Sequence, residues 1–188
     1  MSTRAKGLKN ALLGAIVSVG WTHKINEKQA EKYMQLDNRW KFIQITTAGL
    51  TSTGAVSLLL VDSIWAKVIA AVLGLINFVS SGILKAWDYQ KLFQQSKEYA
   101  NNQFILREKL MDCLRDLAFN NRDIDSINDE WLSLEEERLS LSKLVPATDS
   151  KSVQLASNQL KEEEHNVKDT DYSLFIDKEI LEALHDIK

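Results

Sequence analysis

The sequence has little proline and glycine, the two residues that most often interrupt helices. Its 188 residues include one proline, Pro146, and seven glycines, whereas Leu, Lys, Glu, Gln and Ala are plentiful. Proline breaks a helix and glycine weakens it, so their scarcity favours helices. No alternating strand pattern of useful length and no internal repeat is present. We therefore expect an all-α chain.

Cysteine and histidine are also scarce. The single cysteine, Cys113, excludes an internal disulfide and has no CxxC partner for zinc. We expect it to be a small apolar residue on a helix. The three histidines, His23, His165 and His185, are scattered without HxxxH spacing, which predicts surface residues rather than metal ligands.

Catalytic motifs are missing as well. The sequence contains no GxxxxGK, GxGxxG, HExxH or GxSxG pattern, and its carboxylates lie on polar helix faces. We expect no enzyme and predict no catalytic, cofactor-binding or metal-binding residue. The net charge of -3 gives no basic excess, so we identify no direct nucleic-acid site.

Two long apolar runs stand out against this polar background. Residues 42–61 carry no charge, and at 1.5 Å rise per residue they make a helix of roughly 30 Å, the thickness of a hydrocarbon core. After Asp62 and Ser63, residues 64–84 form a second run of similar length. Its Lys67 lies one turn from the end, where the side chain can reach the headgroups. The sequence predicts an antiparallel hairpin of two transmembrane helices over residues 42–85.

The flanks of the hairpin predict its place and orientation. Three tryptophans fall at the predicted span ends, as interfacial anchors do: Trp40, Trp65 and Trp87. These anchors and the two full-length spans disfavour a hairpin buried in a soluble domain. Basic residues precede the first span and follow the second, and basic flanks stay on the cytoplasmic side. We expect a multi-pass protein of the inner membrane with both termini cytoplasmic.

Small and polar residues form stripes on both spans. On the second span they are Ala66, Ala70, Gly74, Asn77 and Ser81; on the first they are Gln44, Thr47, Thr51 and Gly54, with Thr46, Thr53 and Ser57 on another side. These residues predict hairpin packing, because Ser and Thr return hydrogen bonds to their own helix. Alternatively they line an interface between copies or a water-filled path. Two polar sides on one span favour a homo-oligomer.

The remaining chain predicts three helical regions. Residues 1–41 hold an apolar run, 11–21, that lacks a signal-peptide cleavage site and predicts a helix at the membrane interface or on the cytoplasmic bundle. Residues 86–145 predict a long cytoplasmic helical hairpin, with one helix from Lys85 to about Asn120. Its second helix packs through a heptad-like stripe: Ile124, Ile127, Trp131, Leu134 and Leu141.

Residues 146–188 predict a polar helical tail. We expect a short helix over 153–165 and a final helix capped by Thr170 or Asp171. The apolar face of that final helix comprises Leu174, Phe175, Leu181, Leu184 and Ile187. Its own bundle, another copy or a regulatory partner would have to cover this face.

The order of these features resembles the SLATT family of two-transmembrane effector domains from bacterial conflict systems. The residues that carry the resemblance lie between Leu12 and Leu117: Arg39 and Trp40 before the hairpin, then Tyr89, Lys91, Leu92, Lys97, Ala100 and Leu106 after it. The resemblance implies an anti-phage effector that oligomerises and breaches the inner membrane when triggered. It also implies a regulatory protein or a nucleotide signal from a defence operon as partner, besides the lipid bilayer.

Two functional hypotheses follow. The first is a membrane effector that permeabilises or depolarises the inner membrane. The alternative is a non-conducting membrane anchor or scaffold whose cytoplasmic helices recruit a partner, which the stripe from Ile124 to Val145 motivates. A small transporter subunit is disfavoured, because no intramembrane acid and no broken-helix Gly/Pro pair marks a substrate site.

Overall fold

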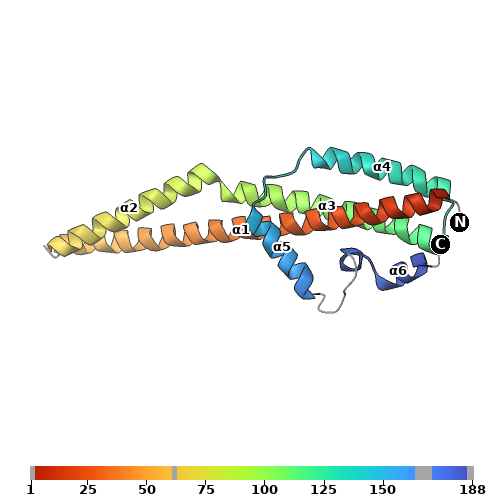
Figure 1. Cartoon of the computed structure of the whole chain (residues 1–188). Helices are drawn as coiled ribbons and strands as arrows, with labels where there is room; N and C mark the ends of the chain where they lie inside the picture. The colour runs from red at the N-terminus through yellow and green to blue at the C-terminus, as the bar shows by residue number, and fades with distance from the viewer. Residues whose placement is uncertain (1–2, 61–62, 164–170, 186–188) are drawn as a thin grey trace. The chain divides into compact units, whose positions relative to one another are not determined.

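The computed structural model describes residues 3–60, 63–163 and 171–185, and every regular element within these ranges is helical. The elements are α1 (Thr3–Leu60), α2 (Ile64–Trp87), α3 (Tyr89–Phe119), α4 (Ile124–Ser142), α5 (Ser150–Glu163), the 3-10 turn η1 (Asp171–Leu174) and α6 (Lys178–His185) (Figure 1). The predicted all-α class is confirmed.

The chain divides into two compact units. The first, here the bundle unit, comprises Met1–Gln29 and Gln95–Lys188, and the second, the hairpin unit, comprises Ala30–Gln94. Helices α1 and α3 contribute residues to both units. Helix α1 also runs without a break through residues 41 and 42, where the sequence analysis placed the start of the hairpin.

The centre of the bundle unit is the contact between α1 and α3. Leucine and isoleucine recur every three or four residues on both helices, which gives each one an apolar face. These faces supply the most deeply buried large side chains of the pair: Leu12, Ile16, Leu106, Leu110 and Leu114, all 0–1% exposed. Near the other end of the pair, His23 Nδ1 lies 2.8 Å from the Ala100 carbonyl and Lys97 pairs with Glu27, so the helices run antiparallel.

Cys113 lies inside this core and is fully buried. Burial raises the pKa of its thiol to about 12. A thiol with that pKa stays protonated at neutral pH and is a poor nucleophile. Cys113 is therefore a small apolar core residue.

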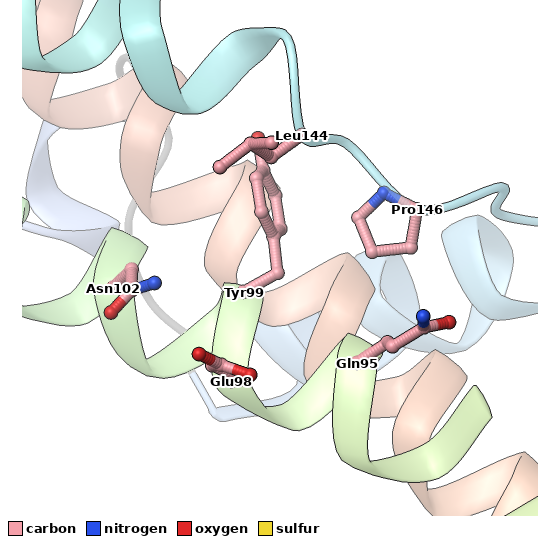
Figure 2. A pocket seen from close by; sticks show the side chains of 6 residues that line it. All are labelled: Gln95, Glu98, Tyr99, Asn102, Leu144 and Pro146. Carbon is pink, nitrogen blue, oxygen red and sulfur yellow. The ribbon is translucent and has the colours of Figure 1, made fainter. Parts of the chain in front are cut away.

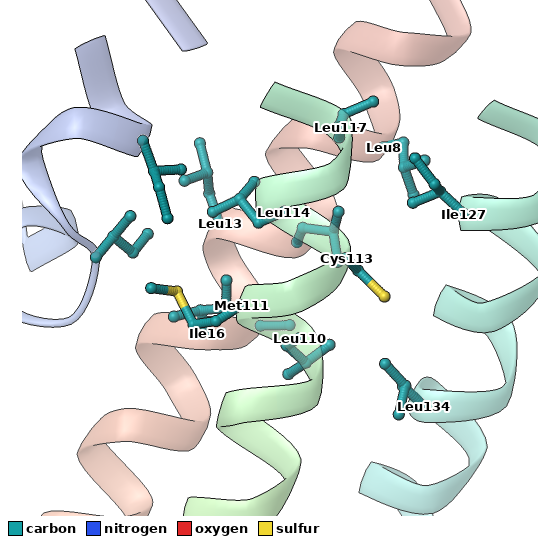
Figure 3. Packing of buried hydrophobic residues seen from close by; sticks show 14 of the residues in the cluster. Leu8, Leu13, Ile16, Leu110, Met111, Cys113, Leu114, Leu117, Ile127 and Leu134 are labelled. Carbon is teal, nitrogen blue, oxygen red and sulfur yellow. The ribbon is translucent and has the colours of Figure 1, made fainter. Parts of the chain in front are cut away.

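Helix α4 covers one side of the α1–α3 pair, and the C-terminal residues cover the other (Figures 1 and 3). Asp123 begins α4 by accepting a hydrogen bond from the Asp125 backbone N–H at 3.1 Å. The whole predicted stripe of α4 lies in or against the core: Ile127 and Leu134 are buried, and Ile124, Trp131 and Leu141 are partly buried.

The last segment differs from the predicted final helix. Asp171 begins the short turn η1, and α6 begins only at Lys178, with the Leu181 N–H bonded to the Asp177 carbonyl at 3.1 Å. Asp177, a favoured residue at a helix start, thus takes the place expected for Thr170 or Asp171. Phe175 precedes α6 instead of lying on it. Thr170 and Ile187 lie outside the described residues.

A second correction concerns the helix expected from Lys85 to Asn120. It is broken at Asp88, whose backbone is left-handed with φ 37° and ψ 58°. Aspartate tolerates this region because its short side chain bonds locally. Here the Asp88 carboxylate accepts the Lys91 N–H at 3.2 Å and so caps α3. With neither glycine nor proline near it, the break had no conspicuous sequence signal.

Gly20 of α1 lies directly against Phe175 of the C-terminal residues. A Cβ atom at this position would lie 2.9 Å from Cγ of Phe175, inside normal contact distance. The Phe175 ring also packs edge-on against Trp21, with ring centroids 5.9 Å apart. The missing side chain of Gly20 therefore makes room for the Phe175 ring.

This contact yields a stability prediction for Gly20→Ala. Overpacking costs about 1–3 kcal/mol, which exceeds the roughly 0.5–1 kcal/mol gained by replacing glycine within a helix. We expect a lower melting temperature for the detergent-solubilised chain, followed by circular dichroism. The control is Gly14→Ala, where no atom lies within 4 Å of an added Cβ and the melting temperature should rise. Equal rises in both variants would contradict the tight contact.

Candidate functional site in the helical hairpin

One segment of the described chain is long and apolar enough to cross a membrane. It is the helical stretch Ile64–Phe119, whose apolar window is only 6% buried. A core helix of a soluble protein would be mostly buried, so this exposure suits a lipid-facing helix. Val61 and Asp62, at the predicted turn, lie outside the described residues. The second membrane crossing of the hairpin stays a prediction.

The outward face of α2 is almost entirely apolar. Its large exposed side chains are Ile64, Trp65, Val68, Ile69, Val72, Leu75, Ile76, Phe78, Val79 and Trp87. Trp65 and Trp87, two of the predicted interfacial anchors, are 73% and 62% exposed near the two ends of the helix. Trp40, on α1, is partly buried. This face needs an apolar medium or an apolar partner to cover it.

The opposite face of α2 carries the predicted small and polar stripe. Ala66, Ala70, Gly74, Asn77 and Ser81 are all partly buried. On α1, Thr47 is buried, and Gln44, Thr51 and Gly54 are partly buried. Gln44 Nε2 donates to Ser81 Oγ at 2.9 Å, so the two stripes meet at this level of the hairpin.

The hydroxyl groups of the hairpin bond mainly to their own helices. Thr47 donates to the Ile43 carbonyl at 2.8 Å, Thr51 to the Thr47 carbonyl at 2.7 Å, and Ser81 to the Asn77 carbonyl at 2.8 Å. Such back-bonding satisfies a hydroxyl inside an apolar medium without water. Thr53, on the second polar side of α1, is exposed and donates to the Gly49 carbonyl at 3.1 Å.

Sequence reasoning missed Ser80, which is 1% exposed and donates to the Ile76 carbonyl at 2.7 Å. On a helical wheel at about 100° per residue, Ser80 falls about 40° outside the edge of the stripe that Ala66 marks. A stripe drawn wider by one position would have included it.

Among the described side chains of the hairpin unit, Asn77 has a buried polar atom that is left unsatisfied. Its Oδ1 atom is shielded from solvent and has no hydrogen-bond partner. Unlike a hydroxyl, an amide oxygen has no hydrogen to donate to its own helix, and burying it unpaired costs about 1–3 kcal/mol. Added Cβ atoms at Gly54 and Gly74 would meet no atom within 4 Å. Close contact between α1 and α2 therefore does not explain these two glycines.

The bundle unit also has an open cavity of about 300 Å³ between α3 and the linker that follows α4. Its lining comprises Gln95, Glu98, Tyr99, Asn102, Leu144 and Pro146. Figure 2 shows the Tyr99 side chain reaching from α3 to Leu144. Burial raises the pKa of the Tyr99 phenol. The cavity thus offers hydrogen-bonding groups around a phenol that stays protonated at neutral pH.

The hydrogen bond between Gln44 and Ser81 can be measured by a double-mutant cycle. Interhelical hydrogen bonds in membrane proteins contribute about 0.6 kcal/mol on average and up to about 1.7. We expect a coupling in that range between Gln44→Leu and Ser81→Ala, measured by reversible unfolding in detergent. As a control, Gln44→Leu combined with Ser52→Ala should show no coupling, because the Ser52 hydroxyl bonds to the Ala48 carbonyl of its own helix. Equal coupling in both cycles would refute the contact.

Comparison with known proteins places these features in a family. The profile of SMODS and SLOG-associating 2TM effector domain family 4, a SLATT family, matches residues 8–171. No curated protein and no solved structure gives a significant match. The matched range extends past the Leu12–Leu117 resemblance at both ends and takes in α2 to α5 completely, so that resemblance is confirmed. The chain belongs to the SMODS and SLOG-associating 2TM effector domain family 4.

Proposed function

We propose that this chain is the membrane effector of a bacterial anti-phage defence system, and that triggered copies oligomerise and permeabilise or depolarise the inner membrane. Membership of a two-transmembrane effector family supports the effector role. The exposed apolar face of α2 supports residence in a bilayer. The proposed action needs no chemistry on a substrate.

The observation that carries the oligomer is Asn77. Within one hairpin this amide oxygen is enclosed without a donor, and a rearrangement that packs α2 against a second copy can supply the missing hydrogen bond. Open space at Gly54 and Gly74 leaves room for another helix to approach closely. In this arrangement the stripe of α2 turns from α1 toward a neighbouring copy, and a ring of such contacts encloses the path for ions.

We propose a multi-pass topology with both termini in the cytoplasm. The basic flanks of the two spans support it, because Lys and Arg remain on the cytoplasmic side. The bundle unit is then the part of the chain that meets a cytoplasmic trigger. A regulatory protein or a nucleotide signal from the same defence operon is the proposed source of that trigger, in keeping with the association with SMODS and SLOG that the family name states.

A non-conducting anchor is the second candidate. The back-bonded hydroxyl groups favour it, because a hairpin with satisfied hydroxyls needs no water-filled path. Against it, the α4 stripe that motivated recruitment of a partner is used within its own core. Replacing residues 42–85 by an unrelated two-span hairpin separates the candidates. An anchor would keep its function in this chimera, and a depolarising effector would lose it.

The proposed function predicts a defect for Asn77→Leu. Losing one interhelical hydrogen bond of about 0.6–1.7 kcal/mol weakens association about 3- to 18-fold per contact. Depolarisation of bacteria after induced expression, followed with a potential-sensitive dye, should fall by at least that factor, while the variant still fractionates with the membrane. The matched control is Ile76→Leu on the exposed face of α2, which should depolarise normally. Full depolarisation by Asn77→Leu would refute the Asn77 interface.

A further inference from the structure

The residues Tyr172–Leu184, here called the C-terminal clasp, pack along α1 in the bundle unit. Phe175 lies against Gly20 and Trp21, and at the other end Lys9 Nζ donates to the Leu184 carbonyl at 3.1 Å. As the clasp advances from 175 to 184, its contacts on α1 move back from 20 to 9, so it runs antiparallel to α1. Three of its side chains are 3–4% exposed and belong to the core: Ile176, Ile180 and Leu184.

The clasp does not fold by itself. Helix α6 has 8 residues, and isolated helices shorter than about 12–15 residues are marginal in water. Its order therefore depends on the surface that receives it, here called the clasp groove and defined by Lys9, Gly20 and Trp21. Figure 3 shows Leu13 and Met111 on the side of the α1–α3 pair that faces the clasp.

The clasp and its groove differ in their relation to the family domain. The groove residues lie within the matched range 8–171, whereas the clasp begins directly after it. The clasp thus lies outside the part of the chain that the family profile matches. An empty groove would expose apolar core residues to water, so simple release of the clasp is unfavourable. An equivalent clasp from another copy can fill the groove with the same contacts, which makes exchange a low-cost route to association.

The tether allows such an exchange. Seven residues, 164–170, separate α5 from the turn η1, with which the clasp begins. Fully extended, seven residues span at most about 25 Å. Copies gathered in a membrane also present their grooves at a high effective concentration.

We propose that the clasp groove is an interaction surface between copies, in which Tyr172–Leu184 of one copy occupies the groove of a second copy in the assembled effector. This proposal rests on the oligomerisation proposed above. The exchange replaces each contact within one chain by the identical contact between chains. It joins the cytoplasmic parts of neighbouring copies while the groove of every copy stays covered.

A disulfide between copies tests the exchange. An added Cβ at Gly20 lies 2.9 Å from Phe175 Cγ, and one bond of about 1.5 Å separates that atom from Phe175 Cβ. The two Cβ atoms are thus at most about 4.4 Å apart, within the range for a disulfide. One full-length chain carries Gly20→Cys with Phe175→Ala, which removes the clashing ring. The second, with a larger tag, carries Phe175→Cys. Cys113 is buried and does not compete.

Both chains are expressed together, their membranes are oxidised, and the bond between chains of unequal size is read on a non-reducing gel. Exchange predicts a mixed disulfide at least tenfold above the control, in which the second chain carries the exposed Glu179→Cys instead. A single chain with both Gly20→Cys and Phe175→Cys reports whether the introduced thiols meet at all. Amine-reactive cross-linking of the same membranes reports the oligomer independently.

The outcomes separate the two proposals. A mixed disulfide above the control establishes exchange. An oligomer without the mixed disulfide, in membranes where the doubly substituted chain closes on itself, overturns exchange and leaves the proposed function standing. Failure of the doubly substituted chain to close, within or between copies, overturns the clasp contact itself. Absence of both oligomer and mixed disulfide overturns both proposals.

Discussion

The antiparallel contact of α1 with α3 is the interaction on which the rest of the bundle unit depends. Leu12 and Leu110 are almost one hundred residues apart in sequence, yet both lie at the centre of one core. Their contact requires the chain to reverse direction between the two helices, and residues 30–94 make that reversal. Helix α4 and the C-terminal clasp have apolar stripes but no core of their own. Each folds by covering one side of the pair.

The sequence predicts much of this fold, because helical periodicity and bilayer length are strong local signals. The α4 stripe from Ile124 to Leu141 needs only its spacing to be recognised, and Asp123 caps the start of α4, as N-cap preferences suggest. The break at Asp88 could not be predicted, since a left-handed aspartate depends on a local hydrogen bond that no pattern encodes. Likewise, spacing alone placed Phe175 on the final helix. In the structure its ring fills the space above Gly20, and spacing does not encode such a tertiary contact.

For the candidate site, the limit of sequence reasoning is chemical. A helical wheel of a membrane span treats Thr, Ser and Asn alike as polar, although their hydrogen-bonding needs differ in an apolar medium. The hydroxyl of Thr51 donates to its own helix and is satisfied there, whereas the amide oxygen of Asn77 needs a donor from elsewhere. A polar stripe is therefore not itself a sign of a pore. The proposed contact between copies therefore rests on the amide of Asn77 rather than on the hydroxyl groups.

The core of the bundle unit changes in character along α1 and α3. Around Leu12 and Leu114 it is wholly apolar, but toward residue 29 its buried side chains become polar: Asn26, Gln29, Ser96 and Gln103, all 0–3% exposed. Asn26 Oδ1 and Ser96 Oγ are buried without partners, which weakens packing there. Local opening occurs where buried apolar contacts are few. Local opening of the bundle unit is therefore expected to cost least at this polar end.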